Sequence, residues 1–263
     1  MKTTNSFISF LIILILSLFT LTQCDNRPAQ KIRQAVKSAR NIFVSQNESE
    51  KQEWVFNNYK SSVFGLDISH HQGLVDWNKI KYFKNKKEIS FVIIRATMGT
   101  KRKDNYFTHN WKSLKTKQII RGAYHYYRPN ENSTKQANNY INHVKLQKGD
   151  LPPILDIEKI STKQSMKNLK IGLKNWLNIV EKYYGIKPII YSGDKFYSTH
   201  LRTKDFKDYS IWIANYNNIR QPKIPNWSFW QFSEKGNVNG VKEYVDLNVF
   251  NGNKRELENL LIK

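Results

Sequence analysis

The sequence predicts an α/β fold, an irregular β/α barrel of the TIM-like kind. From Val63 onward, short runs rich in Ile, Val and Tyr alternate with amphipathic stretches, and this alternation favours a parallel sheet with crossover helices. Eight of the apolar runs have the length of strands, and eight strands close a barrel. The last three follow one another through connections too short for full helices. We therefore expect an incomplete barrel with its active site at the C-terminal ends of the strands.

The individual elements follow from hydrophobic periodicity and from breaker residues. The expected strands are residues 63–68, 91–96, 120–127, 154–158, 188–191, 211–214, 229–232 and 244–247. The expected helices are residues 77–83, 107–116, 135–144 and 166–184. Ser133 is a plausible N-cap for the third helix, and Gly185 followed by Pro188 should end the fourth.

The first residues have the pattern of a targeting segment. Lys2 precedes an apolar run at residues 7–21, which is too short for a mature membrane span but suits a signal peptide. The segment that ends at Cys24 resembles a bacterial lipoprotein signal, in which the cysteine is lipidated, although Gln23 replaces the usual small residue. An ordinary secretory signal or an uncleaved anchor are the alternatives. We expect an exported protein with residues 1–24 as signal, 25–60 as a basic tether and 61–263 as the catalytic barrel.

The charge is strongly positive. Lys and Arg total 43 against 21 Asp and Glu, a formal charge of +22, which favours contact with polyanions such as an acidic cell wall or anionic lipid. A biased genome composition explains the same charge equally well. The motifs typical of nucleic-acid-binding proteins are missing from the sequence, so no nucleic-acid partner is expected. With Cys24 as the one cysteine, an internal disulfide framework and a cysteine-based zinc site are excluded.

Two acids at the end of one strand are the most informative feature. Asp156 and Glu158 are two positions apart after an apolar run, so both side chains point to the same side of the strand. Different surroundings can leave one acid protonated and the other ionised. Cleavage of a glycosidic bond needs such a pair, because one group protonates the leaving oxygen and the other stabilises positive charge at the anomeric centre.

Two further acids occupy similar positions. Asp67 ends the first expected strand and Asp246 lies in the last one. The first and last strands of a barrel are neighbours, so the four acids could surround one pocket. Either of these two aspartates alone would also fit a turn or an N-cap.

At these residues the chain resembles the glycoside hydrolase family 25 lysozymes, the Chalaropsis-type N-acetylmuramidases. The matching segments cover nearly all of residues 63–252. They are FGLDISHHQG at 64–73, FVIIRATMGT at 91–100, RGAYHYYRPN at 121–130, LPPILDIE at 151–158, KPIIYS at 187–192, IWIANY at 211–216, SFWQFS at 228–233 and YVDLNVFNG at 244–252.

The resemblance implies a barrel with five β/α units plus three further strands. It also implies hydrolysis of the β-1,4 bond between N-acetylmuramic acid and N-acetylglucosamine in peptidoglycan, without a cofactor. Glu158 would be the general acid and Asp156 the partner of the substrate's acetamido group, which would act as internal nucleophile. Asp67 and Asp246 would be the other acids of the site. The chain departs from the family at Met98, where the family often has Glu.

Aromatic and polar residues near strand ends are candidates for substrate binding. Sugar rings pack on aromatic faces, and phenol or indole groups can hydrogen-bond to hydroxyls. Tyr126, Tyr191 and Trp212 would line the glycan groove by resemblance, and Trp111, Trp176 and Trp230 are expected to pack in the barrel. The remaining candidates are Tyr216, Gln231 and Arg95, of which Arg95 could equally form a structural ion pair. His70, His71 and His125 do not follow the spacing of a metal site, so structural roles are expected.

The leading hypothesis is therefore an exported or surface-anchored lysozyme that acts on peptidoglycan strands of the bacterial cell wall. A catalytically silent wall-binding protein is one alternative, although all four acids are present. A related glycosidase acting on another N-acetylhexosamine polymer, such as chitin, is another.

Overall fold

The computed structural model describes residues 26–83, 87–216 and 221–263, and the segment around Cys24 lies outside them. The chain divides into two compact units, Met1–Asn47 and Glu48–Lys263. Helix α2 (Asn26–Asn58) begins in the first unit and ends in the second. Among the described residues, no helix combines the length and the apolar character that a bilayer crossing requires.

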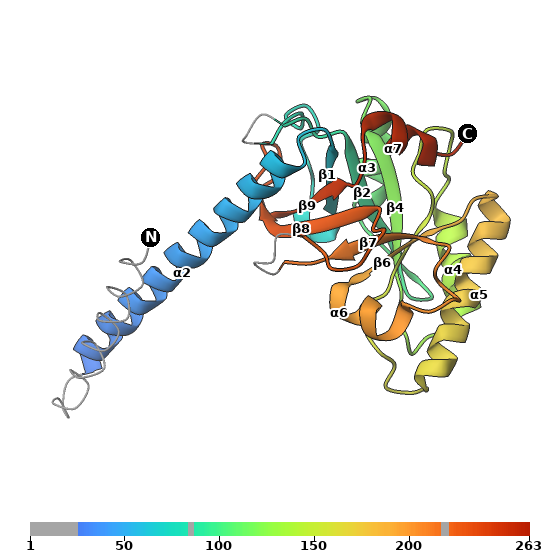
Figure 1. The fold of residues 1–263 in the computed structure, drawn as a ribbon, viewed down its shortest axis with the longest axis horizontal. Helices are drawn as coiled ribbons and strands as arrows, with labels where there is room; N and C mark the ends of the chain where they lie inside the picture. Colours follow the sequence, from blue (N-terminus) through green and yellow to red (C-terminus); the bar gives the residue numbers. More distant parts are fainter. Residues whose placement is uncertain (1–25, 84–86, 217–220) are drawn as a thin grey trace. The chain divides into compact units, whose positions relative to one another are not determined.

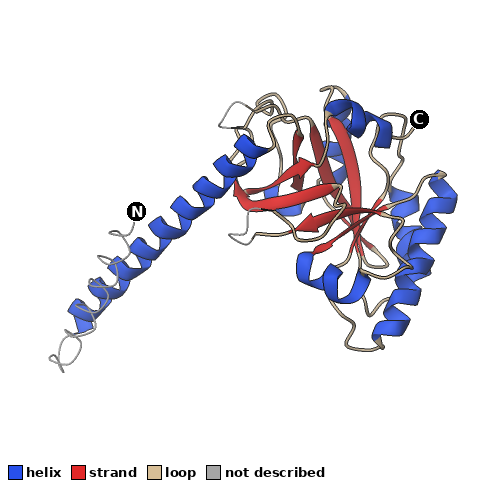
Figure 2. Ribbon diagram, viewed as in Figure 1, coloured by secondary structure: helices blue, strands red, loops and turns tan. Residues whose placement is uncertain are grey.

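The second unit is built around a closed sheet (Figures 1 and 2). In the described part of the chain the sheet has nine strands in the order β1-β9-β8-β7-β6-β5-β4-β2-β3, and an additional pairing of β1 with β2 closes it. The short β3 extends β2 as a hairpin outside the closure. The strands are β1 (Val63–Ile68), β2 (Phe91–Met98), β3 (Arg102–Lys103), β4 (Ile120–Tyr126), β5 (Ile154–Asp156), β6 (Ile189–Gly193), β7 (Ser210–Ala214), β8 (Phe229–Gly236) and β9 (Val245–Phe250).

The predicted irregular β/α barrel is confirmed. Strands β1, β2, β4, β5, β6, β7 and β8 run parallel to one another, whereas β9 is antiparallel to both β8 and β1. The other helical elements are η2 (His70–Gln72), α3 (Phe107–Lys115), α4 (Ser133–His143), α5 (Met166–Tyr184), α6 (Asp194–Phe196), the π-helical turn η3 (Tyr197–Leu201) and α7 (Lys254–Leu260). Figure 1 shows α4 and α5 side by side.

Residues alternate between the inside and the outside of the barrel, as the period of a strand requires. One apolar cluster contains Phe91, Ile93, Ile154 and Ile189 and fills the interior. Gly65 belongs to the same inward row, and a Cβ there would lie 2.4 Å from the ring of Phe91. Glycine at this position therefore makes room for a large side chain inside the barrel.

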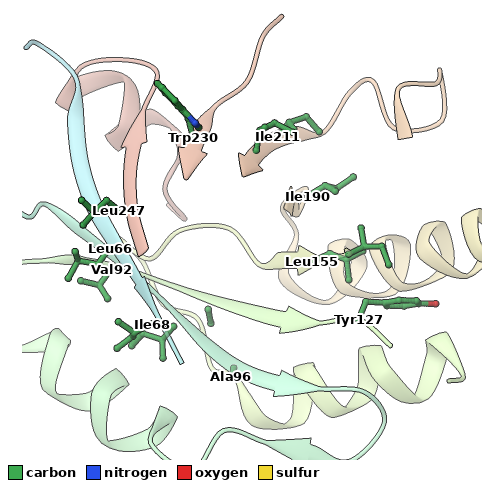
Figure 3. Packing of buried hydrophobic residues seen from close by; sticks show 14 of the residues in the cluster. Leu66, Ile68, Val92, Ala96, Tyr127, Leu155, Ile190, Ile211, Trp230 and Leu247 are labelled. Carbon is green, nitrogen blue, oxygen red and sulfur yellow. The ribbon is translucent and has the colours of Figure 1, made fainter. Parts of the chain in front are cut away.

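A second cluster joins the outer face of the strands to the helices. Leu155, Ile190 and Ile211 are register partners on β5, β6 and β7, and Figure 3 shows them following one another across this face. On α5, Trp176 is fully buried. These contacts pack the helices against the outer face of the barrel, which helps to fix the strand ends in position.

Two predictions about helices were wrong. The segment 77–83 forms turns and no helix, because Phe83 N donates to Lys87 O and Ile89 N donates to Lys81 O, which pairs the segment with the next one. The N-cap of α4 is Asn132, whose side chain accepts a hydrogen bond from Lys135 N, and Ser133 is the first helical residue. The predicted end of α5 is confirmed, since Gly185 caps the helix with φ 72°.

The C-terminal part of α2 belongs to the barrel unit. Val55 and Phe56 are buried there. The ring of Phe56 lies 4.8 Å from that of Phe64 and 5.7 Å from that of Phe232, measured between centroids. Within the stretch 25–60, residues 48–58 thus contribute to the core of the barrel unit. That residues 25–60 serve as a tether stays a prediction.

We predict that Phe56→Ala destabilises the protein by about 3–5 kcal/mol, because it removes a buried ring and leaves a cavity. Val36 lies on the same helix and is 48% exposed, so Val36→Ala should change the free energy of unfolding by less than about 0.5 kcal/mol. Urea unfolding of the two variants measures the difference, and equal midpoints would show that Phe56 does not support the barrel.

Candidate active site

A small pocket of about 70 Å³ opens at the C-terminal end of the barrel. Seven of its lining residues continue the inward rows of the strands, above the apolar cluster. The lining consists of Asp67, Tyr124, Asp156, Glu158, Tyr191, Trp212, Gln231 and Asp246. Toward the C-terminal end of the barrel, the inward positions therefore change from mainly apolar to mainly polar. The pocket thus lies directly above the apolar interior cluster.

Asp67 is held by two amide side chains. Gln231 Nε2 and Asn248 Nδ2 each donate to Asp67 Oδ2 at 2.7 Å. The amide oxygens are also engaged: Tyr191 OH donates to Gln231 Oε1 at 2.7 Å, and Trp212 Nε1 donates to Asn248 Oδ1 at 2.8 Å. All of these residues are buried, so the network fixes the amide orientations and the position of the carboxylate.

Asp67 and Asp246 form a carboxyl pair. They are register partners on β1 and β9, and their side chains hydrogen-bond to each other. Desolvation raises the pKa of both groups, and for Asp246 the charge of Asp67 raises it further. Two such carboxyls share one proton, because both cannot ionise side by side. The hydrogen bonds from Gln231 and Asn248 favour Asp67 as the ionised member.

Asp246 enters the site in a different way from the other acids. The sequence interpretation placed it with Asp67 at the end of a strand, but Asp246 lies near the beginning of β9. Since β9 is antiparallel to β1 and β8, its first residues lie at the same end of the barrel as the last residues of the parallel strands. The prediction that the four acids surround one pocket is confirmed.

Asp156 is the last residue of β5 and is 3% exposed. Its register partners are Tyr126 on β4 and Tyr191 on β6. Its Oδ1 is buried and has no hydrogen-bond partner among the residues that the structure describes. Burial raises the pKa of Asp156 well above its ordinary value, and the charges of Glu158 and Asp67 add to the increase. An unpartnered carboxyl oxygen in a pocket is ready to accept a hydrogen bond from a ligand.

Glu158 lies two residues beyond Asp156, after the end of β5, and its side chain reaches solvent at the pocket's mouth. The surrounding protein still removes part of its hydration, which raises the pKa of Glu158, while Lys159 and a hydrogen bond from Tyr126 act in the opposite direction. The predicted common side of Asp156 and Glu158 is confirmed, because both line the pocket. One acid is thus enclosed and the other is accessible.

The pocket wall is aromatic. The rings of Tyr191 and Trp212 meet edge to face with centroids 4.4 Å apart, and Tyr124 meets Trp212 at 6.4 Å. The sequence interpretation missed Tyr124 and Asn248. Both residues occupy positions on β4 and β9 that point into the barrel. Which positions point inward can be read only when the register of the barrel is known.

The other predicted residues lie around this pocket. Tyr216 is partly exposed and its OH donates to Gln231 Oε1. Arg95 forms an ion pair with Asp104 at 3.1 Å. Of the two roles considered for Arg95, the structure thus shows the structural ion pair. The three tryptophans Trp111, Trp176 and Trp230 are buried as expected. Cys24 lies outside the described residues.

The histidines have structural contacts. His125 is fully buried, with Nδ1 2.7 Å from Thr97 Oγ1 and Nε2 3.2 Å from Gln136 Oε1. Burial lowers the pKa of His125 to about 4, so the ring is neutral. His70 contacts Arg95. Among the described residues, no group of three or more His, Cys, Asp and Glu side chains is arranged to hold a metal ion.

The site has the chemistry of a glycosidase. It combines an accessible carboxyl with a raised pKa, an enclosed second carboxyl, and aromatic walls that suit sugar rings. All of them lie at the C-terminal end of a β/α barrel, where such folds carry their active sites.

The chain belongs to the Glycosyl hydrolases family 25 and is a glycoside hydrolase. The family model matches residues 66–241, a range that contains Asp67, Asp156 and Glu158. The fold and the residue pattern thus agree on the class of enzyme.

Similar proteins include both bacterial sequences and solved structures. The Escherichia coli K12 protein named Uncharacterized protein YegX is 40% identical over 200 residues, which are 75% of this chain and 72% of that protein. Lysozyme M1 of Streptomyces globisporus is 32% identical over 212 residues, covering 75% and 70%. The structure of a family 25 glycosyl hydrolase from Bacillus anthracis has a TM-score of 0.68 and 30% identity, covering 76% of this chain and 94% of that one.

The carboxyl pair predicts how stability depends on pH. The pKa values of Asp67 and Asp246 are raised above the ordinary 3.8 in the folded protein. The folded state therefore binds more protons than the unfolded state, and the free energy of unfolding falls as pH rises above 3.8 through the raised values. We predict that Asp246→Asn unfolds at a higher temperature than wild type at about pH 8 and that the gain shrinks at about pH 5.

Thermal unfolding of both proteins at the two pH values measures this effect. Asp208→Asn removes a carboxylate from an exposed position and serves as the control, with no pH-dependent change expected. Equal unfolding temperatures for Asp246→Asn and wild type at both pH values would contradict the shared proton.

Proposed function

We propose that the protein is a lysozyme that hydrolyses the β-1,4 bond between N-acetylmuramic acid and N-acetylglucosamine in peptidoglycan. The observation that carries the proposal is the unpartnered Asp156 oxygen beside the accessible carboxyl of Glu158 in one pocket. Membership of family 25 and the similarity to Lysozyme M1 support the choice of substrate.

Glu158 acts as the general acid in this proposal. Burial raises its pKa, which favours the protonated form that an acid needs, and its place at the mouth of the pocket suits contact with the leaving oxygen. It gives its proton to that oxygen as the glycosidic bond breaks. The resulting carboxylate then takes a proton from the water molecule that completes hydrolysis.

Asp156 holds the acetamido group of the muramic acid unit. Its free oxygen accepts the amide N–H, which turns the acetamido oxygen toward the anomeric carbon. That oxygen forms a bond to the carbon as the leaving group departs. The ring so formed carries positive charge, which favours the ionised form of Asp156 and is stabilised by that carboxylate. Water attack on the anomeric carbon opens this ring and restores the acetamido group.

The remaining residues shape the site. Asp67, the ionised member of its pair with Asp246, holds negative charge near Asp156, and its network positions Tyr191, Trp212 and Gln231. We assign Tyr191 and Trp212 to the sugar in the pocket, and Tyr126 and Tyr216 to the rim of the groove. The proposed partner is the bacterial cell wall, reached after export and held near the membrane by a lipid anchor at Cys24.

The acid role predicts the effect of Glu158→Gln. The amide keeps the shape and loses the transferable proton, so the rate of wall lysis should fall by about 10²–10⁴-fold while wall binding persists. Turbidity clearing and a sacculus-binding assay measure both. Glu243→Gln, at an exposed position, is the matched control and should lyse at the wild-type rate. Lysis by Glu158→Gln at that same rate would exclude Glu158 as the acid.

Acetamido participation predicts a dependence on N-acetylation. Peptidoglycan without N-acetyl groups should be cleaved at least about 100-fold more slowly than acetylated peptidoglycan, because it lacks the internal nucleophile. Asp156→Asn should be slow on both, since an amide stabilises positive charge poorly. Mass spectrometry of the reducing ends released from each substrate gives the rates. Equal rates of the wild-type enzyme on acetylated and deacetylated peptidoglycan would show that the acetamido group is not the nucleophile.

A further inference from the structure

A second pocket of about 230 Å³ lies at the same end of the barrel. It is lined by residues at the ends of β1 and β2 and on β3, among them His70, Arg95, Met98, Arg102, Lys103 and Asp104. Strand β2 runs between β1 and β4, which carry Asp67 and Tyr124 of the catalytic pocket. Neighbouring strands are about 4.8 Å apart, so this cationic pocket is adjacent to the catalytic one.

Asp104 is fully engaged within the cationic pocket. Its side chain is 1% exposed. Asp104 Oδ2 accepts from Arg95 Nε at 3.1 Å and from His70 N at 2.8 Å, and Oδ1 accepts from Tyr106 N at 3.0 Å. This carboxylate balances Arg95. Burial and the charge of Arg95 lower the pKa of His70, so its ring is neutral at neutral pH.

Arg102 and Lys103 leave the pocket with excess positive charge. Both are exposed on β3. Within the described ranges 26–83, 87–216 and 221–263, neither side chain forms an ion pair with a carboxylate. The half-buried Met98, which is the register partner of Arg102, contributes an apolar surface and no charge. The lining of the cationic pocket thus contains three cationic side chains, Arg95, Arg102 and Lys103, and one carboxylate, Asp104.

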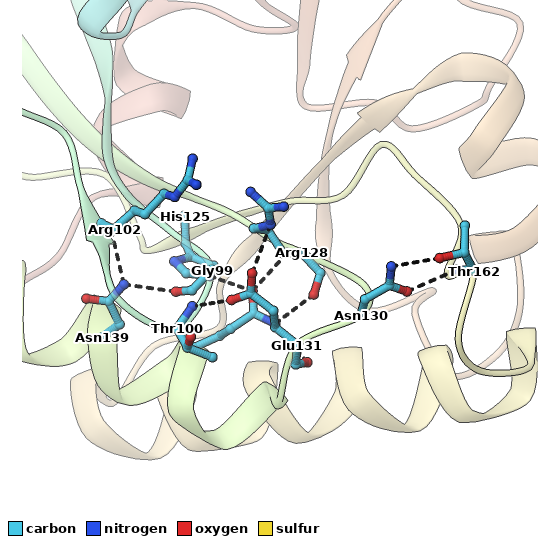
Figure 4. Close-up of polar contacts among 10 residues, drawn as sticks. Gly99, Thr100, Arg102, His125, Arg128, Asn130, Glu131, Asn139 and Thr162 are labelled. Atoms are coloured by element: carbon cyan, nitrogen blue, oxygen red, sulfur yellow. Dashed lines mark hydrogen bonds and ion pairs between the residues drawn. The ribbon is translucent and has the colours of Figure 1, made fainter.

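The hairpin that carries these cations is fixed by its backbone (Figure 4). Asn139 Nδ2 donates to Gly99 O at 2.9 Å and to Arg102 O at 3.2 Å, and Glu131 Oε2 accepts from Thr100 N at 2.6 Å. Gly99 adopts φ 59°, and a Cβ there would meet Glu131 Oε2 at 2.4 Å. In Figure 4 the guanidinium of Arg102 points away from these contacts. The side chain is therefore available to a ligand, while its backbone is held in place.

We propose that this cationic pocket is a subsite for a carboxylate on the lactyl and peptide substituent of the muramic acid unit. The proposal rests on the proposed function, because it concerns the substrate of that reaction. A muramic acid unit bound through its acetamido group at Asp156 carries this substituent on the neighbouring ring carbon. Arg102 and Lys103 would bind the carboxylate by charge-assisted hydrogen bonds, and Met98 would pack against its carbon chain.

The test compares kcat/KM on two forms of purified peptidoglycan. One is untreated and carries free carboxylates, and in the other these groups have been converted to neutral amides by carbodiimide coupling with ammonia. Wild type should prefer the untreated form by about tenfold or more, as expected for charge-assisted hydrogen bonds. The double variant Arg102→Gln/Lys103→Gln should lose this preference, because its kcat/KM on the untreated form falls to its value on the amidated form.

Two further variants separate the subsite from general charge effects. Lys254→Gln/Arg255→Gln removes one Lys and one Arg from exposed positions on α7, beside the opening at the other end of the barrel, and should keep the wild-type preference. Met98→Glu places a negative charge in the cationic pocket and should weaken cleavage of the untreated form at least about tenfold more than Met98→Gln does, because the two side chains differ in charge and hardly in size.

The outcomes distinguish the subsite from the proposed function. A double variant that keeps the preference, or that slows on both substrates equally, overturns the subsite while the enzyme remains a lysozyme. A wild-type enzyme that cleaves neither form overturns the proposed function, and the subsite falls with it. An amidase that removes the peptides releases a lactyl carboxylate, which is bonded to the peptide as an amide in intact strands. Dependence on Arg102 and Lys103 with these stripped strands shows that the subsite accepts the lactyl carboxylate, and loss of the dependence shows that it requires a carboxylate of the peptide.

Discussion

Desolvation of carboxyl groups at the end of the closed barrel is the constraint on which the site depends. Asp67, Asp156 and Asp246 sit above an apolar interior cluster, where ionisation of several neighbouring acids is unfavourable. Hydrogen bonds offset this cost at Asp67, to which two amide groups donate. The negative charge of the unliganded site therefore concentrates on Asp67, and Asp156 is left with an oxygen that lacks a partner.

This arrangement links the aromatic wall to the acids. Each amide that donates to Asp67 also accepts a hydrogen bond, from Tyr191 on one side and from Trp212 on the other. The groups that would contact a sugar and the groups that would act on it are thus parts of one buried network. Such a network is rigid when all of its members are satisfied, and a rigid site keeps the reacting groups in register.

The reversed last strand completes the site. A parallel β9 would place Asp246 at the opposite end of the barrel, far from Asp67. Because β9 is antiparallel to both neighbours, it closes the barrel without a crossover helix and still brings an acid to the catalytic end. The same end carries the β2–β3 hairpin, so anionic and cationic features of the molecule lie next to each other. A substrate with a neutral ring and a charged substituent would match this separation of charge.

Most elements of the barrel and the chemical class follow from local patterns in the sequence. Apolar runs of strand length and the period of α5 follow from local patterns, which is why the barrel and the helix 166–184 were predictable. The pair Asp156 and Glu158 was visible for the same reason, since two positions along one strand share a face. Resemblance across residues 63–252 then indicated the family.

Contacts between distant elements set which groups face each other. The segment 77–83 has helical spacing, but backbone pairing with residues 87–89 holds it as turns. The register of β4 and β9 brings Tyr124 and Asn248 into the site. Arg95 forms an ion pair with Asp104, which follows β3. Residues 48–58, polar in composition, contribute Val55 and Phe56 to the core of the barrel unit. In each case the deciding contact joins residues from different elements, and a linear pattern carries no information on such a contact until the closure of the barrel sets the register.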